Sequence, residues 1–195
     1  MKESPFFSPD IAEFLRLLAV HKVRYLIVGG EAVIYYGHAR LTGDIDLFFD
    51  RSLKNSKLLF KALNEFWGNA IPGIRDAKEL MVKNVVVQFG VPPNRIDLMN
   101  AVDGVRFGMA WNNRKVEKVS FKGKEFSINY IGLDDLIRNK RKANRARDEE
   151  DIRFLEEVRK RMKRPKQGYR NEYKNNDATE HRDTCQHPRR RTSSQ

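Results

Sequence analysis

The chain contains little of what secreted and membrane proteins depend on. Its one cysteine, Cys185, excludes a disulfide within the chain and fits a reducing compartment. The N-terminal residues MKESPFFSPD hold no signal-peptide core, and no apolar run approaches the roughly 20 residues that span a bilayer. Acidic residues are also scarce, with 26 against 38 basic residues and a net charge of +12. We therefore expect a cytoplasmic protein that binds an anionic partner and no membrane.

Apolar residues are unevenly distributed along the 195 residues. They make up 40% of the chain, which is enough for one domain with a modest core. From Pro165 onward the sequence has almost no apolar residues and many charged or amide side chains. Such a composition cannot bury enough surface to fold. The sequence thus predicts a folded domain over residues 1–164 and a disordered basic tail over residues 165–195.

Hydrophobic periodicity within the domain predicts both strands and helices. Short apolar runs predict buried strands at 25–28, 85–89 and 95–99, and a hairpin at 115–121 and 125–130. Helical spacing predicts helices that start after Ser8 and Ser52, and at 133–142 and 148–163. This pattern indicates an α/β (α+β) fold, with a mixed sheet flanked by helices and a helical C-terminal part.

The most informative stretch is Gly29-Gly30, followed after thirteen residues by Asp44-Ile45-Asp46. The glycine pair lets the backbone turn sharply beside a bulky anion, and the next residues can start a helix whose free N–H groups face that anion. Asp44 and Asp46 are two residues apart in a predicted strand, so their side chains share one face. Two close carboxylates repel each other unless a cation lies between them. A hard divalent ion such as Mg²⁺ fits oxygen ligands of this kind.

In these residues the chain resembles the nucleotidyltransferase superfamily named after DNA polymerase beta. That family has an apolar residue, Gly, Gly or Ser, about nine to thirteen residues, and then Asp-apolar-Asp/Glu-apolar. The matching residues are Val28, Gly29, Gly30, Asp44, Ile45, Asp46 and Leu47. The wider pattern is similar to the bacterial branch that includes abortive-infection and other toxin-type nucleotidyltransferases. The resemblance covers roughly residues 8–160 and implies a nucleotidyltransferase fold.

The resemblance also implies a third carboxylate on a later strand. Asp97, between Ile96 and Leu98, repeats the apolar-acid-apolar signature and is the candidate. Asp44 and Asp46 would then bind both the metal that accompanies the triphosphate and the catalytic metal, Mg²⁺ or Mn²⁺. Of the two metals, Asp97 would bind only the catalytic one, and it would help to accept the proton of the attacking hydroxyl. All three acids are the predicted metal ligands and catalytic residues.

Further residues are predicted to bind the nucleotide. Gly29 and Gly30 would hold the β- and γ-phosphates through backbone N–H groups. Arg40 could reach a phosphate, and Thr42 would order the turn before the strand.

A charged cluster near the C-terminal helices has two interpretations. The toxin branch has a Lys…Arg…Arg-Asp-x-x-Asp element that is matched by Lys140, Arg145, Arg147, Asp148 and Asp151. That resemblance implies that Lys140 or Arg145 binds the triphosphate and that Asp148 positions it. The alternative is a solvated charge run in which Asp148 and Asp151 form a capping box at a helix start.

The resemblance implies transfer of a nucleoside monophosphate from an NTP to an acceptor, with release of pyrophosphate. The implied acceptors are RNA, tRNA included, or a protein hydroxyl, and the implied biological role is the toxin of a toxin–antitoxin pair with a cognate antitoxin. One alternative is a non-catalytic nucleotide- or RNA-binding relative, although a binding protein has no need of the third acid. Another is nucleotidylylation of a small molecule such as an antibiotic, which leaves the basic surface without a purpose.

Overall fold

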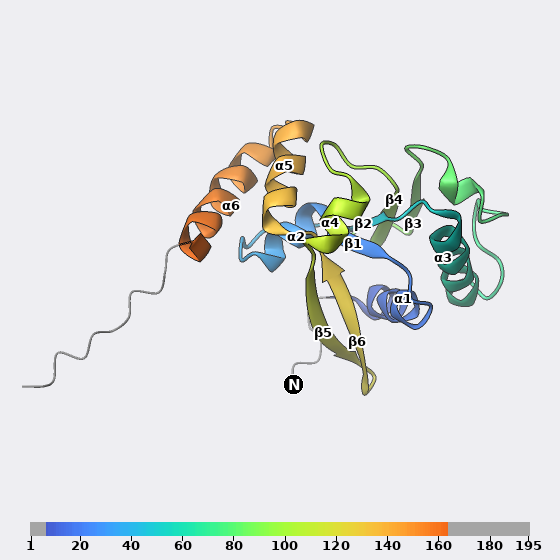
Figure 1. Ribbon diagram of the computed structural model, residues 1–195. Helices are drawn as coiled ribbons and strands as arrows, with labels where there is room; N and C mark the ends of the chain where they lie inside the picture. The colour runs from blue at the N-terminus through green and yellow to red at the C-terminus, as the bar shows by residue number, and fades with distance from the viewer. Residues whose placement is uncertain (1–6, 164–195) are drawn as a thin grey trace, which may run out of the picture. The chain divides into compact units, whose positions relative to one another are not determined.

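A computed structural model describes residues 7–163, which form a six-stranded mixed sheet in the order β3-β4-β2-β1-β6-β5 (Figure 1). The strands are β1 (Tyr25–Val28), β2 (Asp44–Phe49), β3 (Val86–Phe89), β4 (Arg95–Met99), β5 (Lys115–Phe121) and β6 (Lys124–Tyr130). This arrangement confirms the predicted mixed sheet flanked by helices. The predicted tail, residues 165–195, and Cys185 lie outside the described residues.

Helices flank this sheet. They are α1 (Pro9–Val20), α2 (Gly29–Tyr35), α3 (Leu53–Phe66), α4 (Phe107–Asn112), α5 (Leu133–Ala143) and α6 (Asp148–Lys163), with a short 3-10 turn η1 (Glu79–Met81). The side chains of Ser8 and Ser52 accept hydrogen bonds from backbone N–H groups three residues later and thereby cap α1 and α3. Helices α1 and α3 pack together, and α5 lies beside α6 (Figure 1). Within residues 7–163, no helix has the length and apolar character needed to cross a membrane.

Strand β2 lies near the centre of the sheet and carries the acidic motif. It pairs antiparallel with β1 and parallel with β4, and in this register Asp46 lies opposite both Val28 and Asp97. Ile45 and Leu47 are fully buried on the other face of β2. Because side chains alternate along a strand, burial of these two residues directs the acids to the opposite face.

Aromatic contacts fix the position of α2, which begins at the glycine pair. The Tyr35 ring stacks on Tyr130 of β6 with 4.1 Å between ring centroids. The Tyr35 hydroxyl donates a hydrogen bond to Glu117 (2.7 Å), and the Tyr36 hydroxyl donates one to the backbone carbonyl of Ile131 (2.8 Å). These bonds tie α2 to the β5–β6 hairpin and keep its first residues beside β2.

Candidate active site

A cleft of about 780 Å³ opens over the acidic face of β2 and β4. All of the predicted site residues line it: Gly29, Gly30, Arg40, Thr42, Asp44, Asp46, Asp97, Lys140, Arg145 and Asp148. They come from α2, from the loop before β2, from β2 and β4, and from the α5–α6 region. The fold therefore brings together residues that are up to 119 positions apart, from Gly29 to Asp148.

Gly29 is required by its backbone angle and by the space around it. Its φ is +62°, and a Cβ atom at this position would lie 1.9 Å from Oδ2 of Asp46. A Cβ at Gly30 would lie 3.1 Å from Oγ1 of Thr42. The glycine pair therefore allows the start of α2 to approach the acidic strand more closely than any other residue would.

We expect Gly29→Ala to destabilise the protein by more than strain at a positive φ alone, which costs about 1–3 kcal/mol. The added methyl group must also push the Asp46 carboxylate aside. Gly68→Ala is the matched control, because Gly68 has φ +58° with no atom within 4 Å of the added Cβ. Thermal melting should show a larger loss of stability in Gly29→Ala than in Gly68→Ala. Mg²⁺–NTP titration should show loss of binding in Gly29→Ala only. Equal effects of the two substitutions would contradict the steric argument.

The carboxylates in the cleft carry more negative charge than their surroundings favour. Burial, together with repulsion from Asp44 and Asp97, raises the pKa of Asp46 to about 6. A neighbouring carboxylate, Glu31 in the first turn of α2, has its pKa raised to about 7 by burial and by repulsion from Asp44 and Asp46. Sequence reasoning missed Glu31, since a glutamate in a first helical turn is ordinary. The shifted pKa values indicate a site that favours an added cation.

Two side chains hold Asp97, and sequence reasoning missed both. Gln88 of β3 lies opposite Asp97 and donates a hydrogen bond from Nε2 to its Oδ2 (3.1 Å). Arg95 donates a short hydrogen bond to Oδ2 of Asp44, and its Nε lies 3.0 Å from Oδ1 of Asp97. Arg95 precedes Asp97 by two residues, so strand periodicity alone could have placed the two on the same face.

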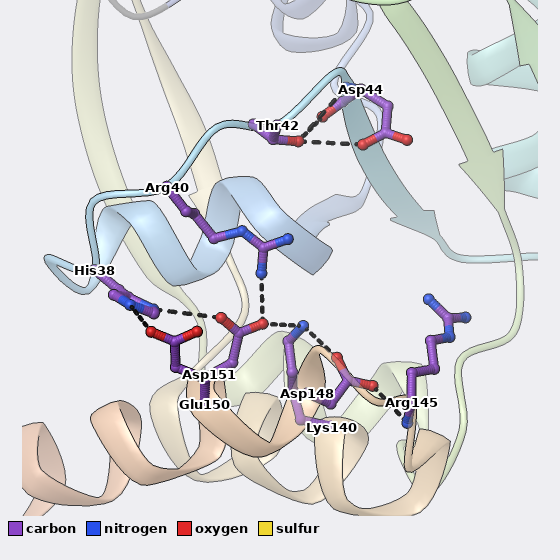
Figure 2. A network of polar contacts seen from close by, with 9 residues as sticks. All are labelled: His38, Arg40, Thr42, Asp44, Lys140, Arg145, Asp148, Glu150 and Asp151. Carbon is purple, nitrogen blue, oxygen red and sulfur yellow. Dashed lines mark hydrogen bonds and ion pairs between the residues drawn. The ribbon is translucent and has the colours of Figure 1, made fainter.

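The charged cluster of α5 and α6 forms a buried network (Figure 2). Nζ of Lys140 lies 2.8 Å from Oδ1 of Asp148 and 2.8 Å from Oδ2 of Asp151. The second carboxylate oxygen of Asp148 accepts a hydrogen bond from the Arg145 backbone N–H (3.2 Å). All three charged side chains are nearly inaccessible to solvent. Both acids thus contact Lys140, and Asp148 also accepts a hydrogen bond from the preceding turn. The predicted capping box would instead pair each acid with the backbone N–H of the other.

The network continues into the loop before β2. Oδ2 of Asp151 lies 2.5 Å from Nη1 of Arg40, and its Oδ1 lies 3.3 Å from Nδ1 of His38 (Figure 2). The His38 ring stacks on Phe154 of α6 with 4.6 Å between centroids, so His38 packs on α6. Burial alone would raise the pKa of Asp151, but Lys140 and Arg40 outweigh it and hold that pKa below its ordinary value. Helix α6 thereby fixes the loop that carries Arg40.

The residues present fit a divalent cation. Asp44, Asp46 and Asp97 offer hard oxygen donors on one face of neighbouring strands. Oδ1 of Asp97 is buried and accepts no hydrogen bond, although it has the ion-pair contact with Arg95. Within the described residues no three acidic or imidazole side chains already converge as metal ligands. The guanidinium group of Arg95 contacts both Asp44 and Asp97.

Comparison with known proteins gives a family match over most of the chain. Residues 9–167 match the model of a family described as nucleotidyltransferase of unknown function (DUF6036). No curated protein matches the chain at a significant level. The matched span covers the sheet, the cleft and both C-terminal helices. The chain therefore belongs to this family of nucleotidyltransferases.

Proposed function

We propose that the protein transfers a nucleoside monophosphate from an NTP to an acceptor hydroxyl in a reaction that depends on Mg²⁺ or Mn²⁺ and releases pyrophosphate. The observation that carries this proposal is the register of β2 and β4, which places Asp46 opposite Asp97 with Asp44 two residues away. Gly29 lies against the same carboxylate of Asp46. Phosphate-binding backbone and metal-binding acids are thus adjacent, as nucleotidyl transfer requires.

Each acid has a separate task in this proposal. Asp44 and Asp46 hold the divalent ions, and Asp97 holds the catalytic ion and accepts the proton of the acceptor hydroxyl. When bound, the ions neutralise the triphosphate and stabilise the charge that develops as the α-phosphate is attacked. Gln88 keeps one oxygen of Asp97 in place through its hydrogen bond. The arrangement holds the acids without closing the cleft to the nucleotide.

In this proposal the triphosphate lies along a basic wall of the cleft, formed by Arg40 and Arg145. Gly29 and Gly30 allow it to approach the backbone, and Arg40 and Arg145 supply positive charge. Asp151 fixes the orientation of the Arg40 guanidinium. Lys140 contributes charge from its buried position, but two carboxylates already hold its ammonium group. Its main effect on the nucleotide is therefore to place Asp148 and the turn that Asp148 contacts.

The acceptor that we propose is RNA, tRNA included, or a protein hydroxyl. The net charge of +12 supports an anionic macromolecule as the acceptor. Because carboxylates gather in the site, the excess positive charge lies outside it, where such a macromolecule would bind. A role as a toxin with a cognate antitoxin is part of the proposal and is supported by the sequence resemblance described above.

Incubation of the protein with each labelled NTP, Mg²⁺, and total cellular RNA or protein tests this function. We expect label from at least one NTP to be incorporated into one acceptor class, with pyrophosphate released and with loss of both signals in EDTA. Asp46→Asn should abolish incorporation. Nucleotide binding without incorporation by any NTP would favour a non-catalytic nucleotide-binding protein, and incorporation into a small molecule alone would exclude the macromolecular acceptors.

The same variant should remain folded in metal-free buffer. Since the pKa of Asp46 is raised from 3.8 to about 6 in the folded protein, the stability linked to its protonation is present below pH 3.8 and is lost as the pH rises through 6. Asparagine removes this penalty, so at pH 7 Asp46→Asn should melt at the same temperature as the wild type or higher, and the difference should shrink on acidification. A variant that fails to fold at pH 7 would show that Asp46 is structural.

A further inference from the structure

Arg95 is the basic residue that lies directly among the predicted metal ligands. On the parallel pair β2–β4 it is opposite Asp44, and Asp97 follows two residues later on the same face. One guanidinium group therefore joins two carboxylates, with a hydrogen bond to Oδ2 of Asp44 and an ion pair to Oδ1 of Asp97. The Arg95 side chain is 31% exposed, so water and ions reach it from the cleft.

Two other cations of the cleft form ion pairs away from Asp44 and Asp97. Lys140 contacts Asp148 and Asp151, and Arg40 contacts Asp151. Among residues 7–163, Arg95 is the basic residue that forms ion pairs with Asp44 or Asp97. Its position therefore differs in kind from the basic wall, which neutralises the cleft from a distance.

A guanidinium group and a divalent ion compete for the same carboxylate oxygens. Mg²⁺ requires its oxygen ligands at about 2.0–2.1 Å in near-octahedral geometry. A guanidinium group that contacts oxygens of two carboxylates occupies the space between those oxygens. Oδ2 of Asp44 and Oδ1 of Asp97 both face Arg95, so binding of a metal between these acids requires the guanidinium to move.

From these contacts we infer that Arg95 is a resident counter-cation, which neutralises Asp44 and Asp97 in the metal-free protein and which a divalent ion displaces. This inference rests on the metal dependence proposed above. It makes free Mg²⁺ a weak ligand, because the ion must first break existing ion pairs. A nucleoside triphosphate that binds together with its metal offers its phosphates as new anionic partners for the released guanidinium. Metal and nucleotide then bind cooperatively, with Arg95 as the residue that couples them.

Titration of the full chain with Mn²⁺ in the absence of nucleotide tests the inference. Arg95→Gln should bind Mn²⁺ about fivefold more tightly than the wild type, because two partly exposed ion pairs no longer oppose the metal. Arg147→Gln is the control, since Arg147 lines the same cleft and is exposed. It removes the same charge without an ion pair to Asp44 or Asp97 and should change Mn²⁺ affinity by less than about twofold.

The outcomes separate this inference from the proposed function. Equal gains for Arg95→Gln and Arg147→Gln would show a general charge effect and overturn the displacement, as would unchanged affinity in Arg95→Gln. Absence of Mn²⁺ binding in both the wild type and Arg95→Gln, with or without NTP, would overturn the metal-dependent function and the inference together. Tight binding by the wild type that matches Arg95→Gln would overturn the inference alone.

The guanidinium itself provides a second measurement. In protein labelled with ¹⁵N-arginine, the Nε–H signal of Arg95 is identified by its absence from Arg95→Lys. We expect this signal to shift on saturation with Mg²⁺ and NTP, while the signal of Arg24, which pairs with Asp50 outside the cleft, stays in place. An Arg95 signal that does not move at saturation would show that the metal binds without displacing the arginine.

Discussion

Asp97→Asn should reduce single-turnover nucleotidyl transfer by at least about 10²–10³-fold while Mg²⁺–NTP affinity stays close to that of the wild type. Asp44 and Asp46 still hold the metal that accompanies the triphosphate, and Gly29 still allows the triphosphate to approach the backbone. The catalytic metal loses its third carboxylate, so the acceptor hydroxyl is no longer activated. The asparagine oxygen can still accept the hydrogen bond from Gln88, which preserves the β3–β4 pairing.

The control for this substitution is another acid of the same cleft. Asp103 also lines it, but the hydrogen bond that Asp103 accepts from Asn139 (3.0 Å) is to its backbone carbonyl. Asp103→Asn should therefore retain turnover within a few fold. NTP titration and single-turnover rates, measured for both variants, show whether each substitution affects binding or turnover. Near-normal turnover in Asp97→Asn would place the third metal ligand on another residue.

Lys140→Met should lower the free energy of unfolding by about 3–5 kcal/mol. The substitution leaves the carboxylates of Asp148 and Asp151 buried without the ammonium that contacts both. Asp151 keeps its ion pair with Arg40, whereas Asp148 keeps only the backbone N–H of Arg145. An unpaired buried charge costs more than the pair contributes, so the loss is expected to exceed that of an ordinary surface ion pair.

Lys142→Met separates this network from a general loss of charge on α5. Lys142 lies two residues further along the same helix and is exposed, so its substitution should change stability by no more than about 0.5 kcal/mol. Urea unfolding of both variants measures the difference. If Lys140→Met is as stable as Lys142→Met and has lost only NTP binding, the ammonium acts on the nucleotide and not in holding the helices.

The acidic motif could be predicted from local sequence because its geometry is local. Side chains two positions apart on a strand lie on one face, and the apolar residues Ile45 and Leu47 show which face is buried. The same reasoning identified Asp97, and the register of β2 with β4 places it beside Asp46. That register depends on how two distant segments pair, which one sequence does not show. The adjacency of these two acids could therefore be expected only from the family resemblance.

Partners of charged residues were harder to predict than their positions. The sequence shows Lys140, Asp148 and Asp151 as a charge run, and such runs are usually solvated. Burial turns them into a network because α6 packs against α5 and against the loop at Arg40. Arg95 was overlooked for a related reason: an arginine at a strand start is commonplace, and its role depends on an acid of a different strand.

The tie between α6 and the loop before β2 has a consequence for synthesis of the chain. Arg40 and Asp151 are 111 positions apart, so at about 5–20 residues per second the ribosome adds the aspartate roughly 6–22 s after the arginine. For most of that interval the acidic strand and the glycine pair exist in the nascent chain, while Arg40 lacks the carboxylate that holds it. The basic wall of the cleft is thus completed among the last steps of translation of the folded region, after the residues that it serves.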